Sequence, residues 1–330
     1  MNILITGVGS TLGYGILETV KKSGLDCELS GADYFETAAG LYRVDFPFIL
    51  PDVLSSKVSS EDWLDSVIEI IKQQNIDYVL VGLDFEVPLF SKFRNRIEAF
   101  CGCRVIVSSE KVVEICNDKW LTYCFLRDNG FDAPRSCLPS EIASFKLEVQ
   151  FPWIVKPRQG STSNGLFRVI DHNSLSYALN NCNNPIIQEE VGISDEEYTC
   201  GVLSGDGEVL SSMALRRTLK NGNTTVAYYT QCSEIDSYIR RVAEKLGSFG
   251  AINIQLRLTE TGPKIFEINP RFSGTTPVRA CFGLNEISVL FNYLDKSNSV
   301  DVGPLKEGMV IRYTTDQFVA KEDIDKLVIL

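Results

Sequence analysis

The chain has 330 residues, 44% of them hydrophobic, with 32 basic residues against 43 acidic ones. The net charge of −11 argues against a protein whose main partner is nucleic acid or an anionic membrane surface. No apolar run approaches the roughly 20 residues of a membrane span, and a strand-like N-terminus stands where a secretion signal would, so we expect a cytoplasmic protein. The length is long for a single core and predicts two or three lobes.

Histidine is almost absent from the chain. His172 is the only one, which excludes His-rich zinc sites and argues against Ser-His or Cys-His catalysis. The ten cysteines are scattered without a disulfide framework, so we expect reduced and mostly buried thiols. These observations favour chemistry that uses metal ions bound by oxygen ligands.

Residues 1 to about 110 alternate strands with helices. The expected strands are 2–6, 27–32, 77–81 and 104–107, and the expected helices are 11–23, 61–74 and 86–100. This alternation predicts a parallel, doubly wound sheet.

A glycine loop from Gly7 to Gly13 lies between the first strand and the first helix, and Asp33 ends the next strand. This arrangement is typical of a dinucleotide-binding fold. However, Gly13 falls one residue later than the Gly-x-Gly-x-x-Gly pattern requires. A tight turn without a cofactor is the competing interpretation.

The middle of the chain changes character. Residues 109–129 read as one amphipathic helix that contains Asp118 and Lys119 and ends before Gly130. Short strands follow, with glycine-bearing turns, at 153–156, 166–170, 186–190, 198–203 and 208–215. This half of the chain is predicted to be α+β, with a later helix near 236–246.

A strand at 151–157 contains Lys156 near its end and is followed by the Gly/Ser-rich loop 158–165. Such a loop can direct backbone N–H groups and hydroxyls at phosphate oxygens, while the lysine supplies a point charge. An ordinary flexible hairpin tip is the alternative. Further on, the strand 186–191 turns polar at its end and Glu197 opens the next strand, which together suit a purine and a ribose.

The stretch 266–274 carries the strongest signal. Along a strand of period two, Glu267, Asn269 and Arg271 share one face, and Phe266 and Ile268 are expected to point into a core. A carboxylate, an amide oxygen and a guanidinium on one face suit a hard cation held against a polyphosphate.

A second strand at 251–258 is expected to pair with this one. If the link 259–263 closes a hairpin with Leu258 opposite Lys264, Gln255 lies across from Glu267. Two oxygen-bearing side chains then meet over one site. A hairpin with a solvated polar face is the alternative.

Taken in order, these segments resemble the ATP-grasp superfamily, and most closely its carbamoyl-phosphate-synthase-like carboxylate-amine ligases. The segments that carry the resemblance are Asp118-Lys119, Lys156 with its loop, 188–191, Glu197, Gln255 and 267–271. The loop at 7–9, Asp33 and 84–86 look like that family's pre-ATP-grasp domain. The resemblance implies an α/β plus α+β fold with a doubly wound domain at 1–110, a two-lobed ATP-grasp domain at 111–300 whose small lobe is about 130–190, and a tail at 301–330 packing on the large lobe.

The resemblance also implies roles for individual residues around ATP and Mg²⁺, with Mn²⁺ as an alternative ion. Lys119 and Lys156 would contact the phosphates, which Ser161 and Ser163 would cover. The adenine would be lined by Gln188, Glu189, Glu190 and Val191, and the ribose would be bound by Glu197, with Glu196 as the alternative. The metal would be bound by Gln255, Glu267 and Asn269. Arg271 would stabilise the transferring phosphoryl group, and Arg217, or its rival Arg216, would hold substrate or phosphate. Lys156, Arg217 and Arg271 are therefore the expected catalytic residues.

The implied reaction activates a small carboxylate as an acyl phosphate and joins it to an amine. A single ATP-grasp unit argues against the two-unit, glutamine-fed synthesis of carbamoyl phosphate. The expected partners are small molecules, and a homodimer is an option; Asp84, Glu86, Arg279 and Asn285 are guesses for the substrate pocket. Two alternatives stay open, namely an NAD(P)-binding oxidoreductase that uses the glycine loop and an inactive ATP-grasp binding module.

Overall fold

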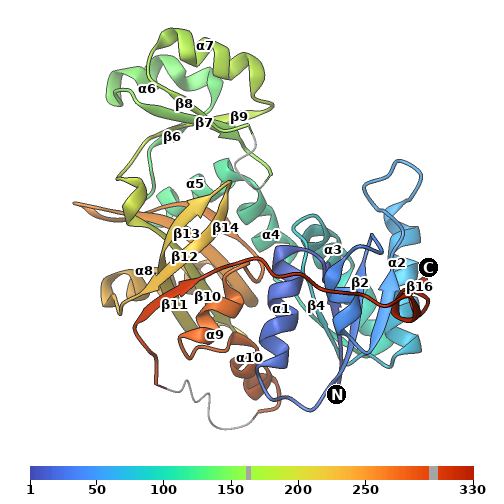
Figure 1. Ribbon diagram of the computed structural model, residues 1–330. Coiled ribbons are helices and arrows are strands. Elements are labelled where there is room, and N and C mark those ends of the chain that lie inside the picture. The colour runs from blue at the N-terminus through green and yellow to red at the C-terminus, as the bar shows by residue number, and fades with distance from the viewer. Residues whose placement is uncertain (161–164, 297–303) are drawn as a thin grey trace.

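The computed structural model describes residues 1–160, 165–296 and 304–330. Ser161 and Ser163, expected in the phosphate loop, lie outside these ranges. The chain forms a six-stranded parallel sheet, a six-stranded antiparallel sheet and a four-stranded sheet, so the expected mixture of α/β and α+β architecture is confirmed (Figure 1). None of the helices in the described ranges is long and apolar enough to span a bilayer.

The N-terminal domain is built on the parallel sheet, whose order is β16-β3-β2-β1-β4-β5. Its strands are β1 (Asn2–Thr6), β2 (Glu28–Asp33), β3 (Phe46–Ile49), β4 (Tyr78–Leu80), β5 (Arg104–Ile106) and β16 (Val328–Ile329). Its helices are α1 (Thr11–Lys21), α2 (Ser60–Gln73) and α3 (Glu86–Cys101), with a 3₁₀ turn η1 (Ala39–Arg43). Helix α1 packs with Ile3 and Ile5, whereas α2 and α3 pack with Leu4 and Val79, so helices cover both faces of the sheet.

Two helices lead from this domain to the rest of the chain. The sequence predicts one helix over 109–129, but the structure has α4 (Glu110–Asn117) and α5 (Lys119–Asp128). The break falls at Asp118, whose backbone is extended and whose carboxylate accepts hydrogen bonds from the N–H groups of Trp120 and Leu121. Asp118 is therefore the N-cap of α5, a position that favours aspartate.

The small lobe is a four-stranded antiparallel sheet covered by two helices, and it stands apart from the remainder in Figure 1. Its strands run in the order β6-β9-β7-β8. Its elements are β6 (Ser136–Cys137), η2 (Pro139–Glu141), α6 (Ile142–Glu148), β7 (Trp153–Pro157), β8 (Phe167–Val169), α7 (His172–Asn181) and β9 (Pro185–Glu189).

The large lobe is the antiparallel sheet β14-β13-β10-β11-β12-β15. Its elements are η3 (Ser194–Glu196), β10 (Glu197–Ser204), β11 (Val209–Lys220), β12 (Asn223–Tyr229), α8 (Ser233–Leu246), β13 (Gly250–Thr259), β14 (Gly262–Asn269), α9 (Thr276–Cys281), α10 (Glu286–Leu294) and β15 (Gly308–Ile311). Ile16 and Leu17 of α1 share one hydrophobic core with Met213 and Leu290 of this lobe. The N-terminal domain and the large lobe are therefore packed together.

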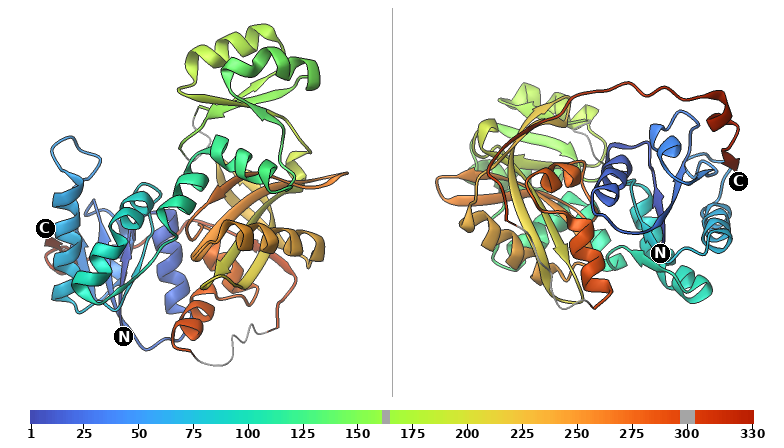
Figure 2. Two further views of the ribbon diagram at one scale, coloured as in Figure 1. Left: turned by 180° about the vertical axis from the view of Figure 1, so that it is seen from behind. Right: turned by 60° about the horizontal axis from the view of Figure 1, so that its bottom comes forward.

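The C-terminal segment differs from the expectation that it packs on the large lobe. Strand β15 does join the large-lobe sheet, beside β12. The chain then crosses to the N-terminal domain, forms the short helix α11 (Lys321–Ile324), and ends in β16, which pairs in parallel with β3 (Figures 1 and 2).

Candidate functional site

A cavity of about 360 Å³ lies between the small-lobe sheet and the large-lobe sheet. This volume is within the usual range of small-molecule sites. Its walls include ten of the residues singled out from the sequence: Lys119, Lys156, Gln188, Glu189, Glu190, Val191, Glu197, Arg217, Gln255 and Glu267. Residues separated by as many as 148 positions in the chain therefore meet at one place.

The β13–β14 hairpin sets the centre of the site. Gln255 lies directly across from Glu267, as the sequence predicts. The turn end of the hairpin is shifted by one residue, because Leu258 pairs with Pro263 and Arg257 pairs with Lys264. A β-bulge between Gln255 and Leu256 absorbs the difference.

The bulge also corrects the prediction that Phe266 points into a core. Phe266 is the extra, unpaired residue, since Leu256 pairs with Ile265 and Gln255 pairs with Glu267. Ile265 and Ile268 are fully buried, whereas Phe266 is half-buried and lines the cavity. A bulge reorients the side chains around it, which places Phe266 and Glu267 on the same wall.

The residues expected to hold a metal fit that role chemically. Glu267 supplies a carboxylate, and Oε1 of Glu267 accepts a hydrogen bond from Asn269 Nδ2 at 3.1 Å. Gln255 Oε1 accepts from Arg217 Nη2 at 2.8 Å. The described part of the chain holds no cluster of three or more His, Cys, Asp or Glu side chains suited to a metal. One carboxylate and two amide oxygens are hard donors that suit Mg²⁺ when phosphate oxygens and water complete its coordination.

Glu197 is buried between two arginines. Its Oε1 lies 2.7 Å from Arg217 Nη2, and its Oε2 lies 3.2 Å from Arg257 Nη2. Arg257 also donates to the carbonyl of Val191 at 3.1 Å, so it joins the large lobe to the segment after β9. Sequence reasoning did not select Arg257, although it shares the strand face of Gln255 two residues earlier.

The sequence leaves two choices open, between Glu196 and Glu197 and between Arg216 and Arg217, and the positions of these residues distinguish them. Glu197 lines the cavity, whereas Glu196 is outside it and accepts a hydrogen bond from Tyr198 at 3.4 Å. Arg217 lines the cavity, whereas Arg216 stacks over the ring of Tyr228 at 4.6 Å. The geometry therefore favours Glu197 and Arg217.

Lys156 is the buried cation of the site. Its Nζ lies 3.4 Å from the carbonyl oxygen of Phe266 and 5.3 Å from the centre of that ring. Burial lowers the pKa of Lys156 to about 8, and the Glu267 carboxylate partly opposes this shift. Lys119 is more exposed and donates from Nζ to the carbonyl of Gly160 at 2.7 Å.

The start of the loop that follows β7 is held by an ion pair. Arg158 Nε donates to both carboxylate oxygens of Asp118 at 3.0 Å. Burial acts to raise the Asp118 pKa, but the hydrogen bonds from Arg158 and from backbone N–H groups outweigh it, so the pKa is lowered. Asp118 therefore links the start of α5 to the loop that follows β7.

The segment 188–191 is hydrogen-bonded through both its backbone and its side chains: the N–H groups of Glu189 and Glu190 donate to the carbonyls of Arg135 at 2.9 Å and Pro152 at 3.2 Å. Gln188 Nε2 donates to Ser136 Oγ at 2.9 Å, and Glu189 Oε1 accepts from the N–H of Arg135 at 2.8 Å. Glu190 pairs with Arg168 at 2.7 Å. These side chains are engaged within the protein, so polar contacts from them to a planar base would have to replace existing hydrogen bonds.

Arg271 lies away from the cavity wall and reaches the N-terminal domain. Its Nε donates to Asp84 Oδ1 at 2.7 Å, and Asp84 follows strand β4. The pair joins the strand that carries Glu267 to the carboxyl-terminal edge of the parallel sheet.

The glycine loop forms hydrogen bonds within the N-terminal domain. Asp33 Oδ2 accepts from the N–H of Gly9 at 2.8 Å, and Ser10 Oγ accepts from the N–H groups of Leu12 and Gly13. A Cβ on Gly13 would lie 2.1 Å from the carbonyl oxygen of Gly7, so close packing requires a glycine there. These contacts hold the loop against the end of β2, and a second cavity of about 370 Å³ is lined by Gly9, Ser10 and Asp33.

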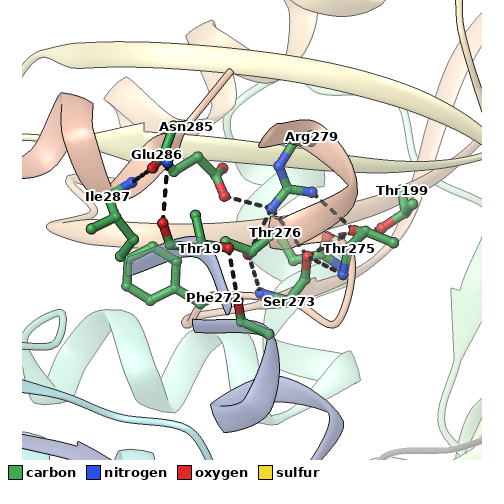
Figure 3. Close-up of polar contacts among 12 residues, drawn as sticks. Thr19, Thr199, Phe272, Ser273, Thr275, Thr276, Arg279, Asn285, Glu286 and Ile287 are labelled. Carbon is green, nitrogen blue, oxygen red and sulfur yellow. Dashed lines mark hydrogen bonds and ion pairs between the residues drawn. The ribbon is translucent and has the colours of Figure 1, made fainter. Parts of the chain in front are cut away.

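The other guessed pocket residues are buried in polar networks. Glu86 accepts hydrogen bonds from Thr6 at 2.5 Å and Tyr34 at 2.7 Å, and burial raises its pKa to about 7. Asn285 caps α10 and donates to the carbonyl of Thr19. Arg279 pairs with Glu286 at 2.8 Å (Figure 3). None of the three lines the cavity between the two lobes.

Comparison with known proteins agrees with this geometry. The family model described as "ATP-grasp in the biosynthetic pathway with Ter operon" matches residues 188–317. The chain is 23% identical over 294 residues to the carbamoyl phosphate synthase arginine-specific large chain of Bacillus subtilis, covering 79% of this chain and 27% of that one. It is 23% identical over 306 residues to carbamoyl-phosphate synthase of Methanobrevibacter smithii, covering 86% and 78%.

Solved structures extend the likeness to the whole fold. L-amino acid ligase of Bacillus licheniformis matches with a TM-score of 0.70 at 20% identity, over 92% of this chain and 77% of that one. The biotin carboxylase domain of Hydrogenobacter thermophilus 2-oxoglutarate carboxylase, crystallised with MgADP and bicarbonate, matches at 0.68 with 14% identity, over 88% and 68%. The resemblance to the ATP-grasp superfamily and to carbamoyl-phosphate synthases is thereby confirmed.

Proposed function

We propose that this chain, which has the ATP-grasp fold, is an ATP- and Mg²⁺-dependent ligase that joins a small carboxylate to an amine. The observation that carries the proposal is the pairing of Gln255 with Glu267 on the wall of the interlobe cavity, beside the buried cation Lys156. The matched proteins include two synthases, a ligase and a carboxylase by name, and the carboxylase domain is crystallised with MgADP. These similarities and the donor groups on the cavity wall support ATP and Mg²⁺ as the cofactors of the chain.

Each wall of the cavity would take one part of MgATP. The backbone of 188–191 would meet the adenine, Lys119 and Lys156 the phosphates, and Gln255, Glu267 and Asn269 the metal, which would neutralise phosphate charge when bound. The Glu197 carboxylate accepts two hydrogen bonds from Arg217 and two from Arg257, so ribose hydroxyls that donate to it would have to share or replace one of them. The N-terminal domain would act as the pre-ATP-grasp domain.

The chemistry needs positioning and charge neutralisation more than proton transfer. A carboxylate oxygen attacks the γ-phosphorus of ATP, which forms an acyl phosphate and releases ADP. The amine nitrogen then attacks the acyl carbon, phosphate leaves, and the amide forms. Lys156 and Arg217 would stabilise charge on the nucleotide side, and Arg271, which pairs with Asp84, would stabilise the transferring phosphoryl group.

ADP release across a panel of amino acids and sugar acids, each with several amines, tests the proposal. We expect ADP only when Mg²⁺, a carboxylate and an amine are all present. Glu267→Gln should slow it by more than about a hundredfold, because loss of one electrostatic group typically costs about that much and the metal site is lost as well. Glu260→Gln, in the exposed hairpin turn, is the matched control. Absence of turnover throughout the panel, together with absence of ATP binding in calorimetry, contradicts the proposal.

A further inference from the structure

The chain leaves the large lobe immediately after β15, at Arg312. The N–H of Arg312 donates to the carbonyl of Thr225 at 2.9 Å, which continues the pairing of β15 with β12. Beyond this point the segment crosses to the N-terminal domain, as Figures 1 and 2 show, and Gln317 Nε2 donates to the carbonyl of Ala39 at 3.4 Å. The crossing segment is therefore held at both ends: the backbone of Arg312 is bonded to the large lobe, and β16 is paired with the N-terminal domain.

The guanidinium of Arg312 lies where three parts of the molecule meet. Its Nη1 is 3.5 Å from the carbonyl of Thr224 and 3.7 Å from the position that a Cβ on Gly274 would occupy. The same position is 2.7 Å from Thr11 Cγ2, in the first turn of α1. Gly274 lies in the loop that follows β14, and it comes three residues after Arg271. Because Gly274 has no side chain, Thr11 packs closely against this loop, next to the guanidinium of Arg312.

Among the residues that the structure describes, Arg312 has no acidic partner. Arg217, Arg257 and Arg271 each pair with a carboxylate, whereas no ion pair is formed by Arg312 within the ranges 1–160, 165–296 and 304–330. Burial lowers the pKa of Arg312, with no charged neighbour to oppose the shift. The nearby N-terminal end of α1 is itself partly positive. A partly desolvated cation in this setting is unfavourable unless an anion joins it.

The loop beside Arg312 is held firmly from the other side. Arg279 donates to Ser273 Oγ at 3.1 Å, to Thr275 Oγ1 at 2.9 Å and to Thr276 Oγ1 at 3.1 Å, while Glu286 balances its charge (Figure 3). Arg279 and Glu286 are both almost completely buried. Gly274 therefore has a fixed position, which a binding site requires.

We propose that Arg312 binds a carboxylate group of the substrate at this junction, as a specificity-determining residue contributed by the C-terminal segment. A guanidinium can hold a carboxylate through two parallel hydrogen bonds, which fixes its orientation as well as its charge. The site lies just beyond the end of β14, which carries Glu267 and Asn269 and is followed by Arg271. The inference rests on the proposed ligase function, because that function supplies the carboxylate substrate.

Kinetics with a carboxylate identified by ADP release test the role directly. Arg312→Gln should raise KM for the carboxylate about tenfold or more and leave KM for ATP unchanged, while Arg312→Lys should recover part of the loss because it restores charge without the planar fork. Arg241→Gln, an exposed arginine on α8, is the control. An unchanged KM for the carboxylate in Arg312→Gln, or an equal rise for both substrates, overturns the proposal.

A second measurement does not depend on turnover. Inorganic phosphate is titrated into the wild type and into Arg312→Gln by calorimetry, with thermal unfolding to show that both are folded. Phosphate bound by Lys119 and Lys156 is common to the two proteins, so the difference isolates Arg312. We expect binding weaker by about tenfold in the variant, as for loss of one charged hydrogen-bonding partner. Equal binding overturns the anion site, whereas a clear difference without any ADP release would support the site and count against the proposed reaction.

Discussion

The ammonium group of Lys156 is buried, and this burial determines when the lysine is charged. In the folded protein its pKa is about 8, against 10.5 for the ordinary lysine value. Between these two pH values the unfolded chain binds more protons than the folded one, so this group makes the stability of the free protein rise with pH. The affinity for a triphosphate should instead fall as the pH rises, because the phosphate oxygens interact favourably with the charged form of Lys156.

We therefore predict that ATP binds more weakly as the pH rises through 8. From pH 7 to pH 9 the affinity of the wild type should fall by about tenfold, since the charged fraction of Lys156 falls by that order. Lys156→Arg should show no such fall, because arginine stays charged throughout. Calorimetry of both proteins at several pH values checks this, and parallel pH profiles would contradict the assignment of Lys156 to the phosphates.

At the scale of elements, period-two patterning predicts the pairing of Gln255 with Glu267 but not the bulge beside it. Alternation reports which residues share a face of a regular strand, and the extra residue Phe266 interrupts that regularity. The helix break at Asp118 was missed for a related reason, since α4 and α5 follow each other without a glycine or proline. In both places, local hydrogen bonding and packing decide the geometry.

Other residues of the site depend on contacts between distant elements. The Glu197–Arg257 pair and the Arg271–Asp84 pair join segments 60 and 187 positions apart. Strand β3 was not expected, and neither was β12. Motifs could thus predict residues that meet at the cavity, whereas their partners could not be predicted, because one sequence carries no record of which strands become neighbours.

The bulge makes a testable distinction between two neighbouring residues. Ile268→Ala should destabilise the protein by about 2–5 kcal/mol, the usual cost of truncating a fully buried isoleucine. Phe266→Ala should cost less stability, because Phe266 is half-buried, but should weaken ATP binding because the ring lines the cavity. Urea unfolding and calorimetry measure the two effects. If Phe266→Ala proves as destabilising as Ile268→Ala while ATP affinity is unchanged, Phe266 is a core residue after all.

At the scale of the whole molecule, the cavity between the two lobes and the C-terminal segment are separate. The cavity is lined only by residues between 119 and 267 within the described chain, whereas β16 pairs with β3 at the far edge of the N-terminal sheet. Leu330 packs against the core that α2 and α3 form on that sheet. The end of the chain should therefore matter for the stability of the N-terminal domain and not for the nucleotide.

Removing residues 321–330 tests this separation. The shortened protein should unfold at lower urea concentration, because two ladder positions and the packing of Leu330 are lost and the edge strand β3 is exposed. Its affinity for ATP should stay within about twofold of the full chain, which is close to the usual scatter for sites that do not interact. The truncation keeps Arg312 and its backbone bond to Thr225. A large loss of ATP affinity would show instead that the crossing segment holds the N-terminal domain and the large lobe in the arrangement on which the nucleotide cavity depends.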